Sequence, residues 1–193
     1  MKSWKSLHEK ERKNRAGRPK DPTVNKKIYQ EINRLLETTH FKDMTIDQIA
    51  ENTSVSKATI YRRWRDKESM IVDMFVDQSR IIEPEFDTVF DNLYDFLIKI
   101  MNIYKTPLGS AVIEILISNQ QTEAKDKFMK EYFERNRSIL KSIISKDIDE
   151  ADQDLFIDII FSPIYFNILI KPQTLTKEYI ENMLSVALKA YDI

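Results

Sequence analysis

The sequence contains no cysteine, two glycines, two histidines and six prolines in 193 residues. Without cysteine there is no disulfide, no thiolate metal site and no cysteine nucleophile. The two histidines, His8 and His40, lie far apart in the sequence, and no Ser/His/Asp set accompanies them. So few glycines leave little material for tight β-turns or phosphate-binding loops. These absences argue against an enzyme and against a bound metal or cofactor, and they favour an all-helical protein.

Neither the start of the chain nor its most apolar run has the pattern of a membrane-directed segment. Residues 1–15, MKSWKSLHEKERKNR, are basic and lack the apolar stretch that a signal peptide needs. Residues 155–170, LFIDIIFSPIYFNILI, are interrupted by Asp158, Ser162, Pro163 and Asn167, which makes them a poor bilayer span. We therefore expect a cytoplasmic protein without a membrane partner.

Charge is distributed unevenly along the chain. Residues 1–67 hold 17 Lys/Arg and 9 Asp/Glu, a net charge of +8, whereas residues 68–193 hold 13 and 22, a net charge of −9. A basic front and an acidic remainder indicate two parts with different partners. The front is the part expected to contact a polyanion.

Apolar spacing and capping residues predict about nine helices. Asp21 and Pro22 begin the first, which runs to about residue 39; Thr45 and Gln48 form a capping box for a short second helix, and Ser56 caps a third. A fourth follows from Lys67 almost without a linker. The later helices are predicted at 85–104, 108–118, 123–145, 152–170 and 174–191.

The stretch SVSKATIYRRWRDK, residues 54–67, carries the strongest functional signal. If Ile60 and Trp64 pack inward, Ala58 and Arg62 must face outward, because successive helical residues rotate by about 100°. The flanks of that face then carry Lys57, Thr59, Tyr61 and Arg63. Cationic groups, hydroxyls and one small residue suit a helix that enters the DNA major groove. The alternative is a solvated basic helix face. The capped short helix before it, the small Ala50 and the tight turn between the helices favour a helix-turn-helix.

From Pro22 to Phe75 the sequence resembles the DNA-binding domain of TetR-family (TetR/AcrR-type) transcriptional regulators. The specific match is MTIDQIAENTSVSKATIYRRWRDKESMI, and the rest of the chain is similar only in length, helix count and the segment DLFIDIIFSPIYFNILIKPQTLTKEYIENML. The resemblance implies a basic arm at 1–20, a helix-turn-helix domain at 21–67, and an antiparallel helical domain for ligand binding and dimerisation at 68–193. It also implies a homodimer, most often a repressor, that a small lipophilic or aromatic ligand releases from a near-palindromic operator in double-stranded DNA.

The resemblance assigns roles to individual residues. Lys57 and Ala58 would face bases, and Arg62 would read a base or a phosphate. Phosphates would be held by Thr45, Thr59, Tyr61 and Arg63, with Lys67 clamping the DNA backbone. One departure is visible, because the family usually has glycine at the turn where this chain has Ser54. A left-handed backbone there costs a non-glycine residue roughly 1 kcal/mol.

The segment GRPK, residues 17–20, is interpreted as a minor-groove arm. Arg18, flanked by Arg15 and Lys20, suits the narrow, electronegative groove of A·T-rich DNA. An unstructured solubility tail is the alternative.

The back of the chain is rich in aromatic residues, which predicts a cavity and an interface between two copies. Candidate contacts to an unknown small-molecule effector are Tyr94, Met101, Tyr104, Phe128 and Tyr132, although ordinary core packing is the common role of such residues. The helix at 152–170 is apolar all round and needs cover on both sides. Pairing with a second copy would use Phe156, Ile160, Ile164, Tyr179, Met183 and Leu184, unless that helix is simply the core of one protomer.

One alternative for the whole protein is a helical adaptor that uses its basic face to bind another protein. The acidic cluster DIDEADQD, residues 147–154, lacks the glycine of a calcium loop and is interpreted as the favourable charge at a helix start.

Overall fold

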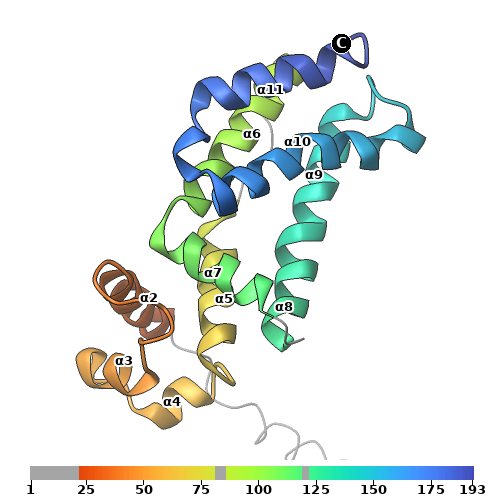
Figure 1. Cartoon of the computed structure of the whole chain (residues 1–193). Coiled ribbons are helices and arrows are strands. Elements are labelled where there is room, and N and C mark those ends of the chain that lie inside the picture. The colour runs from red at the N-terminus through yellow and green to blue at the C-terminus, as the bar shows by residue number, and fades with distance from the viewer. Residues whose placement is uncertain (1–21, 81–85, 119–121) are drawn as a thin grey trace, which may run out of the picture.

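The computed structural model describes residues 22–80, 86–118 and 122–193, and these residues form helices joined by short loops (Figure 1). Three helices, α2 to α4, occupy one end of the molecule, and α5 leads from them into the larger helical part. The elements are α2 (Pro22–Leu36), α3 (Ile46–Thr53), α4 (Lys57–Tyr61), α5 (Lys67–Gln78), α6 (Val89–Tyr104), α7 (Pro107–Ile117), α8 (Glu123–Phe128), the π-helical segment η1 (Met129–Phe133), α9 (Glu134–Ile144), α10 (Glu150–Ile170), the short 3₁₀ turn η2 (Pro172–Thr174) and α11 (Lys177–Lys189).

The prediction of an all-α fold is confirmed: the described residues contain no strand, and their helices match the expected order. The capping box at Thr45 and the cap at Ser56 are both present. One difference lies in the helix predicted at 123–145, where α8 and α9 are joined without a break by the π turn η1. Asp21, the predicted cap of the first helix, lies outside the described residues.

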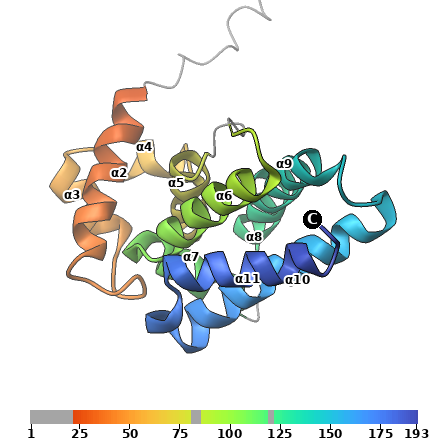
Figure 2. The ribbon, with the colours of Figure 1, turned by 90° about the horizontal axis from the view of Figure 1, so that it is seen from above.

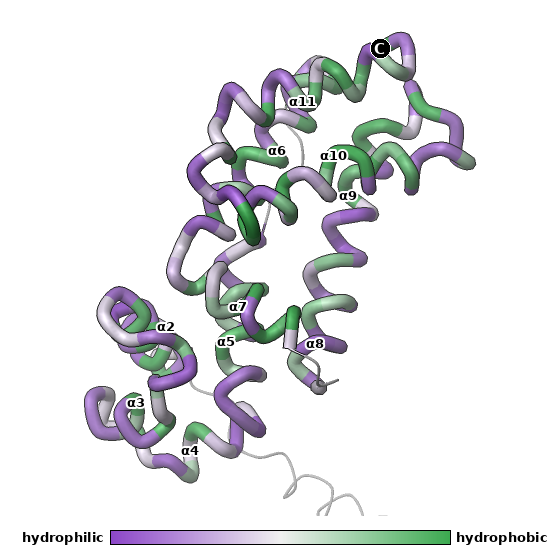
Figure 3. The backbone as a smooth tube through the Cα atoms, viewed as in Figure 1, coloured by the Kyte–Doolittle hydropathy of each residue, from purple (hydrophilic) through white to green (hydrophobic). Residues whose placement is uncertain are grey.

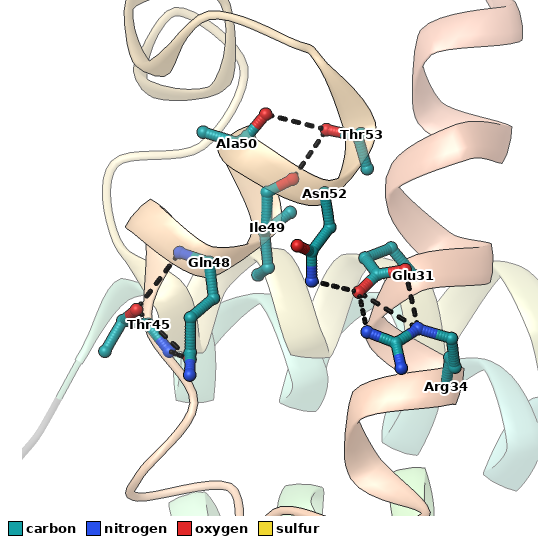
Figure 4. Close-up of polar contacts among 8 residues, drawn as sticks. All are labelled: Glu31, Arg34, Thr45, Gln48, Ile49, Ala50, Asn52 and Thr53. Atoms are coloured by element: carbon teal, nitrogen blue, oxygen red, sulfur yellow. Dashed lines mark hydrogen bonds and ion pairs between the residues drawn. The ribbon is translucent and has the colours of Figure 1, made fainter.

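Polar contacts fix α3 against α2 (Figure 4). The side chain of Asn52 donates to Glu31 at 2.7 Å, and Glu31 is also paired with Arg34 at 2.6 Å. Within α3, the hydroxyl of Thr53 donates to the carbonyl of Ile49 at 2.6 Å. Below these contacts, apolar side chains from α2 and α3 form the core of the front part; they include Ile28, Ile32, Leu35 and Ile49.

Helix α5 belongs to both parts of the molecule. Its buried residues include Met70, Ile71, Met74 and Phe75, and it packs against α7 and α8 of the helical part. Only short loops separate it from α4 (Figure 1). A displacement of the helices around α5 can therefore reach α4 through one continuous helix, in addition to the direct packing of α2 on α7.

The turn between α6 and α7 depends on Gly109. The two helix axes meet at 85°, and a Cβ atom at position 109 would collide with the backbone of Ile103 and Tyr104. Glycine is thus required for the close approach of α7 to the end of α6.

Helices α10 and α11 lie side by side along one edge of the molecule (Figure 2). By length and mean hydropathy alone α10 could cross a bilayer, so those two measures do not support the expectation of a poor span. Hydrophobic residues run along much of α10 (Figure 3). In the fold, however, one side of α10 is buried, and only the other side exposes apolar residues.

Candidate nucleic-acid interface

The turn between α3 and α4 has the left-handed backbone that the sequence analysis expected to be costly at Ser54. Ser54 has φ 55° and ψ 27°, a left-handed backbone, and its N–H donates to the carbonyl of Glu51 as α3 ends. On the other side of the turn, the hydroxyl of Ser56 accepts from the N–H of Thr59 and caps α4. Together the two serines set the direction in which α4 leaves α3.

Helix α4 is short, but its inward residues are firmly seated. Ile60 is fully buried, and Trp64 is buried after the last turn, where its N–H donates to the carbonyl of Ile60 at 3.0 Å. The indole Nε1 of Trp64 donates to Asp73 of α5 at 2.7 Å. These contacts confirm the predicted orientation of the helix, with Ile60 and Trp64 inward.

The opposite face of α4 is exposed and basic. Lys57, Ala58, Tyr61 and Arg62 all point to solvent, and half of the Tyr61 surface is accessible. Lys57 is held by Asp47 of α3 at 2.6 Å, an exposed pair that water screens strongly. This pair keeps the ammonium group near the tip of the helix without burying it.

The remaining flanking residues are less free. Thr59 is half-buried, and its hydroxyl lies 2.9 Å from that of Ser56. Arg63 is half-buried as well, and its Nη1 donates to Asn25 of α2 at 2.7 Å. Arg63 therefore ties α4 to α2, a scaffold contact that the sequence did not reveal.

The structure corrects the role given to Lys67. Its Nζ donates to the carbonyls of Phe41, Lys42 and Met44 at 2.7, 3.0 and 2.7 Å, and lies 4.5 Å from the centroid of the Phe41 ring. An ammonium group has three donors, and all three are used. Burial lowers the pKa of Lys67. We therefore remove Lys67 from the expected DNA contacts and assign it to bracing the loop before α3.

The other predicted DNA contacts are Thr45 and the N-terminal arm. The hydroxyl of Thr45 is exposed at the start of α3, where it takes part in the capping box with Gln48. The arm residues Arg15, Arg18 and Lys20 lie outside the described residues, so their minor-groove role stays a prediction.

Residues 28–74, which include the whole of this exposed face, match the family model for bacterial regulatory proteins of the tetR family. The HTH-type transcriptional regulator YdeS of Bacillus subtilis is 29% identical over 185 residues, covering 91% of this chain and 93% of that one. Rv1556 of Mycobacterium tuberculosis, also described as an HTH-type regulator, is 23% identical over 145 residues, covering 71% of each chain.

Two solved structures share the fold. The TetR family transcription regulator SCO0332 superimposes with a TM-score of 0.68 at 19% identity, over 86% of this chain and 97% of that one. A TetR transcriptional regulator from Rhodococcus sp. RHA1 gives 0.60 at 16% identity, over 88% and 97%.

Together these matches support assigning the chain to the TetR-family regulators. It is a DNA-binding transcriptional regulator with an N-terminal helix-turn-helix. The resemblance based on residues 22–75 is therefore confirmed. The predicted contacts to an effector and to a second copy all lie in the larger helical part.

A joint centred on Asp73 connects the helix-turn-helix to the larger part, and sequence reasoning missed it. Besides Trp64, the carboxylate of Asp73 accepts from Lys127 of α8 and lies 3.5 Å from the hydroxyl of Tyr29 of α2. Burial raises the pKa of Tyr29, and the negative charges of Asp73 and Asp77 raise it further. No motif marks this joint, because its members are far apart in sequence and ordinary in type.

The predicted effector contacts fall into two groups. Tyr104, Phe128 and Tyr132 meet in one buried cluster around Phe75 of α5, with ring centroids 5.3, 6.1 and 5.0 Å from it. Tyr94 is half-buried and stacks on Phe90 instead. Met101 is buried in α6, and of the five predicted effector contacts only Tyr132 lines the hollow beside the cluster. That hollow is lined by Tyr132, Phe133, Asn136, Arg137, Ile157, Phe161 and Tyr165.

The predicted interface residues need a larger correction. Phe156, Ile160, Ile164 and Leu184 are fully buried within one protomer, and only Tyr179 and Met183 are partly exposed. Because α10 is apolar on nearly every side, its pattern could not tell the inner face from the outer one. The exposed apolar residues of this edge are Leu155, Ile159, Phe166, Leu169, Ile170 and Val186.

Proposed function

We propose that this TetR-family regulator is a homodimeric repressor that reads a near-palindromic operator with α4 and is released from it by a small-molecule effector. The observation that supports DNA reading is the exposed face of Lys57, Ala58, Tyr61 and Arg62 on a buried base of Ile60 and Trp64. Lys57 and Arg62 would reach base edges, and the small Ala58 would let the backbone approach the major groove. Tyr61 and Thr45 would hold phosphates. The protein would act in the cytoplasm.

The first test of this proposal is a DNA-binding comparison on an operator selected from a random pool by the wild-type protein. Lys57→Ala and Arg62→Ala should each weaken binding by about 1–3 kcal/mol and relax the preference at particular bases, whereas Tyr61→Phe should weaken all sequences alike. Arg135→Ala removes an exposed arginine of α9 and should change nothing. Equal, sequence-independent losses for all three α4 variants would refute the base-reading roles, and selection of no DNA would refute the function.

Dimerisation is proposed for the outer face of α10, not for the residues first expected. Leu155, Ile159, Phe166 and Ile170 recur at helical spacing and form one exposed apolar stripe beside α11. Stripes of this kind in soluble proteins are commonly covered by another subunit. Pairing of two such edges would present both α4 helices to one side of the duplex, about 34–36 Å apart.

The test of this face is sedimentation of two matched variants. Phe166→Asp should shift the protein to a monomer, because it buries a charge in the proposed contact. Phe86→Asp is the control, since Phe86 is 51% exposed and Phe166 is 53% exposed, but Phe86 lies before α6. If Phe166→Asp leaves the dimer intact while Phe86→Asp disrupts it, the interface does not lie on the outer face of α10.

Release by an effector is proposed to act through α5. Phe75 faces the aromatic cluster, while Asp73, two residues earlier, accepts from Trp64 at the end of α4. A ligand that favours a different position of α5 would lower DNA affinity by the difference between its affinities for the two arrangements.

A further inference from the structure

Three hydrogen-bond donors are buried without a partner at one point of the regulatory core. The hydroxyls of Tyr104 and Tyr132 are on residues 1% and 3% exposed, and the amide of Asn136 is on a residue 5% exposed. Within the described part of the chain, none of Tyr104 Oη, Tyr132 Oη and Asn136 Nδ2 makes a hydrogen bond. Tyr104, Tyr132, Tyr165 and Asn136 nevertheless lie close enough for side-chain hydrogen bonding to contribute to the pKa shifts of Tyr104 and Tyr132, so the three groups satisfy one another only imperfectly. Each such group costs about 1–3 kcal/mol, so three together need an explanation.

The backbone that carries two of these groups departs from the α-helix at the same place. Tyr132 lies in η1, the π turn between α8 and α9, and Asn136 follows one turn later. A π turn accommodates one extra residue in a helix, and such turns are frequent at functional sites. A π turn can move along its helix. When it does, the side chains between its first position and its second point in new directions, so this helix can change its packing at η1.

The hollow beside Tyr132 and Asn136 is aromatic and nearly closed. Its free volume is about 10 Å³, which is room for roughly one water molecule. The rings of Phe133, Phe161 and Tyr165 contribute to its wall. An aromatic ligand must therefore displace side chains on entry, and η1 is the part of the wall where the helix is irregular.

The charges around the hollow are already balanced. Arg137 lines it, but its guanidinium is held by Asp154 and Asp158 at 2.7 and 2.5 Å, and Asp154 is also paired with Lys141. Burial raises the pKa of the phenols of Tyr104, Tyr132 and Tyr165, so they remain neutral donors at physiological pH. An anionic ligand would enter a dry site whose lining cation is already paired, which is unfavourable.

We infer that the effector is a neutral, planar aromatic molecule with at least one acceptor oxygen or nitrogen, which inserts beside η1 and accepts hydrogen bonds from Tyr132 and Asn136. This inference rests on the proposed function and specifies the chemistry of its effector. Insertion displaces Tyr132, whose ring packs on Phe75 of α5 at 5.0 Å and on Phe128 of α8 at 4.9 Å. The ligand thus acts on the two helices that Asp73 and Lys127 join.

The test compares three one-ring probes of similar size on the full-length protein: acetophenone with a neutral acceptor, ethylbenzene with none, and benzoate with a negative charge. Dissociation constants are measured by thermal shift and by titration of the Asn136 side-chain amide signal in NMR spectra. Acetophenone should bind about fivefold or more tightly than ethylbenzene, the ratio that one net hydrogen bond supplies, and benzoate should bind most weakly. In Tyr132→Phe the ratio of acetophenone to ethylbenzene affinity should fall, because only Asn136 remains to donate to the ketone oxygen.

Tyr94→Phe is the matched control, because that phenol stacks on Phe90 outside the hollow and should keep the wild-type ratio. Tyr132→Phe removes a hydroxyl that has no partner among the described residues, so the variant should fold. Equal affinity for acetophenone and ethylbenzene, tightest binding of benzoate, absence of binding, or an unchanged ratio in Tyr132→Phe would each overturn the inference. Operator binding without probes is measured on the same proteins: if it persists while the probes fail, the ligand class is wrong and the regulator stands. If wild-type protein binds no operator, the proposed function fails independently.

Discussion

The helix-turn-helix and the regulatory core differ in how their polar groups are partnered. In the front part, Thr45, Ser56 and Lys67 all bond to groups of their own chain, and the outward face of α4 is exposed. In the core, by contrast, the phenols of Tyr104 and Tyr132 are enclosed by other rings and make no hydrogen bond of good geometry within the described residues. The front part thus presents a preformed surface, whereas the core has buried donors that a bound ligand could satisfy.

This difference bears on how each part would recognise its partner. A preformed basic face can dock on DNA with little internal change, so its affinity should depend on individual exposed side chains and on salt. A closed aromatic hollow must open before it binds, and the cost of opening reduces the apparent affinity of its ligand. Variants in the two parts should therefore differ in the sign of their effect on stability as well as in its size.

The largest effect is expected for Lys67→Met. The substitution keeps much of the aliphatic side chain but leaves the carbonyls of Phe41, Lys42 and Met44 without their donor. The free energy of unfolding should fall by about 3 kcal/mol, since charged hydrogen bonds are worth roughly 1.5–3 kcal/mol each and several are lost. Denaturant titration followed by circular dichroism measures the change.

Lys146→Met is the control for Lys67→Met, because Lys146 is exposed after α9. It should alter stability little. A clamp on DNA would behave differently from a brace: it would leave stability unchanged and reduce only the salt dependence of operator binding. That result would restore Lys67 to the DNA contacts.

The joint between the two parts should show a smaller, coupled effect. In a double-mutant cycle, Asp73→Asn and Lys127→Met should be non-additive by about 1 kcal/mol, because each removes the same partly exposed ion pair. Asp73→Asn keeps an oxygen that can accept from the indole of Trp64, so α4 should stay seated. Additive effects on unfolding would show that the pair contributes no coupling between α5 and α8.

Tyr132→Phe should reverse the usual sign of a core substitution. Losing a buried hydroxyl ordinarily costs stability, but here the hydroxyl has no partner among the described residues, so its removal should be neutral or stabilising by up to about 1 kcal/mol. Tyr29→Phe provides the contrast, because the hydroxyl of Tyr29 faces Asp73 and its loss should destabilise slightly. A clear loss of stability in Tyr132→Phe would indicate an internal water that satisfies the group.

Sequence reasoning succeeded where a feature is local. The caps at Thr45 and Ser56, the left-handed Ser54 and the inward pair of Ile60 and Trp64 each follow from residues within one or two turns of chain. These local rules are enough to build α3 and α4, and they account for most of the exposed face that the family match then supports.

It failed where the outcome depends on distant residues. Lys67 was assigned to DNA from its position in a motif, but three carbonyls more than twenty residues away bind it. The prediction took the buried face of α10 for its outer face, because a helix that is apolar on all sides does not show which side faces solvent. Phe156 and Phe166 look alike in sequence, yet only Phe166 is exposed. The π turn at Tyr132 has no signature at all.

The smallest effect concerns the turn that joins the two helices of the interface. Ser54→Gly relieves a left-handed backbone that costs a non-glycine residue roughly 1 kcal/mol, but the glycine adds freedom to the unfolded chain. The two contributions oppose each other, and we expect a net gain of about 0.5 kcal/mol in the free energy of unfolding. Ser54→Ala is the matched control, since it removes the same hydroxyl and keeps the strain, so it should give no gain. If alanine stabilises as much as glycine, the cost lies in the side chain of Ser54 and the backbone of the turn is relaxed, which would mean that the direction of α4 is set by Ser56 and Ile60 alone.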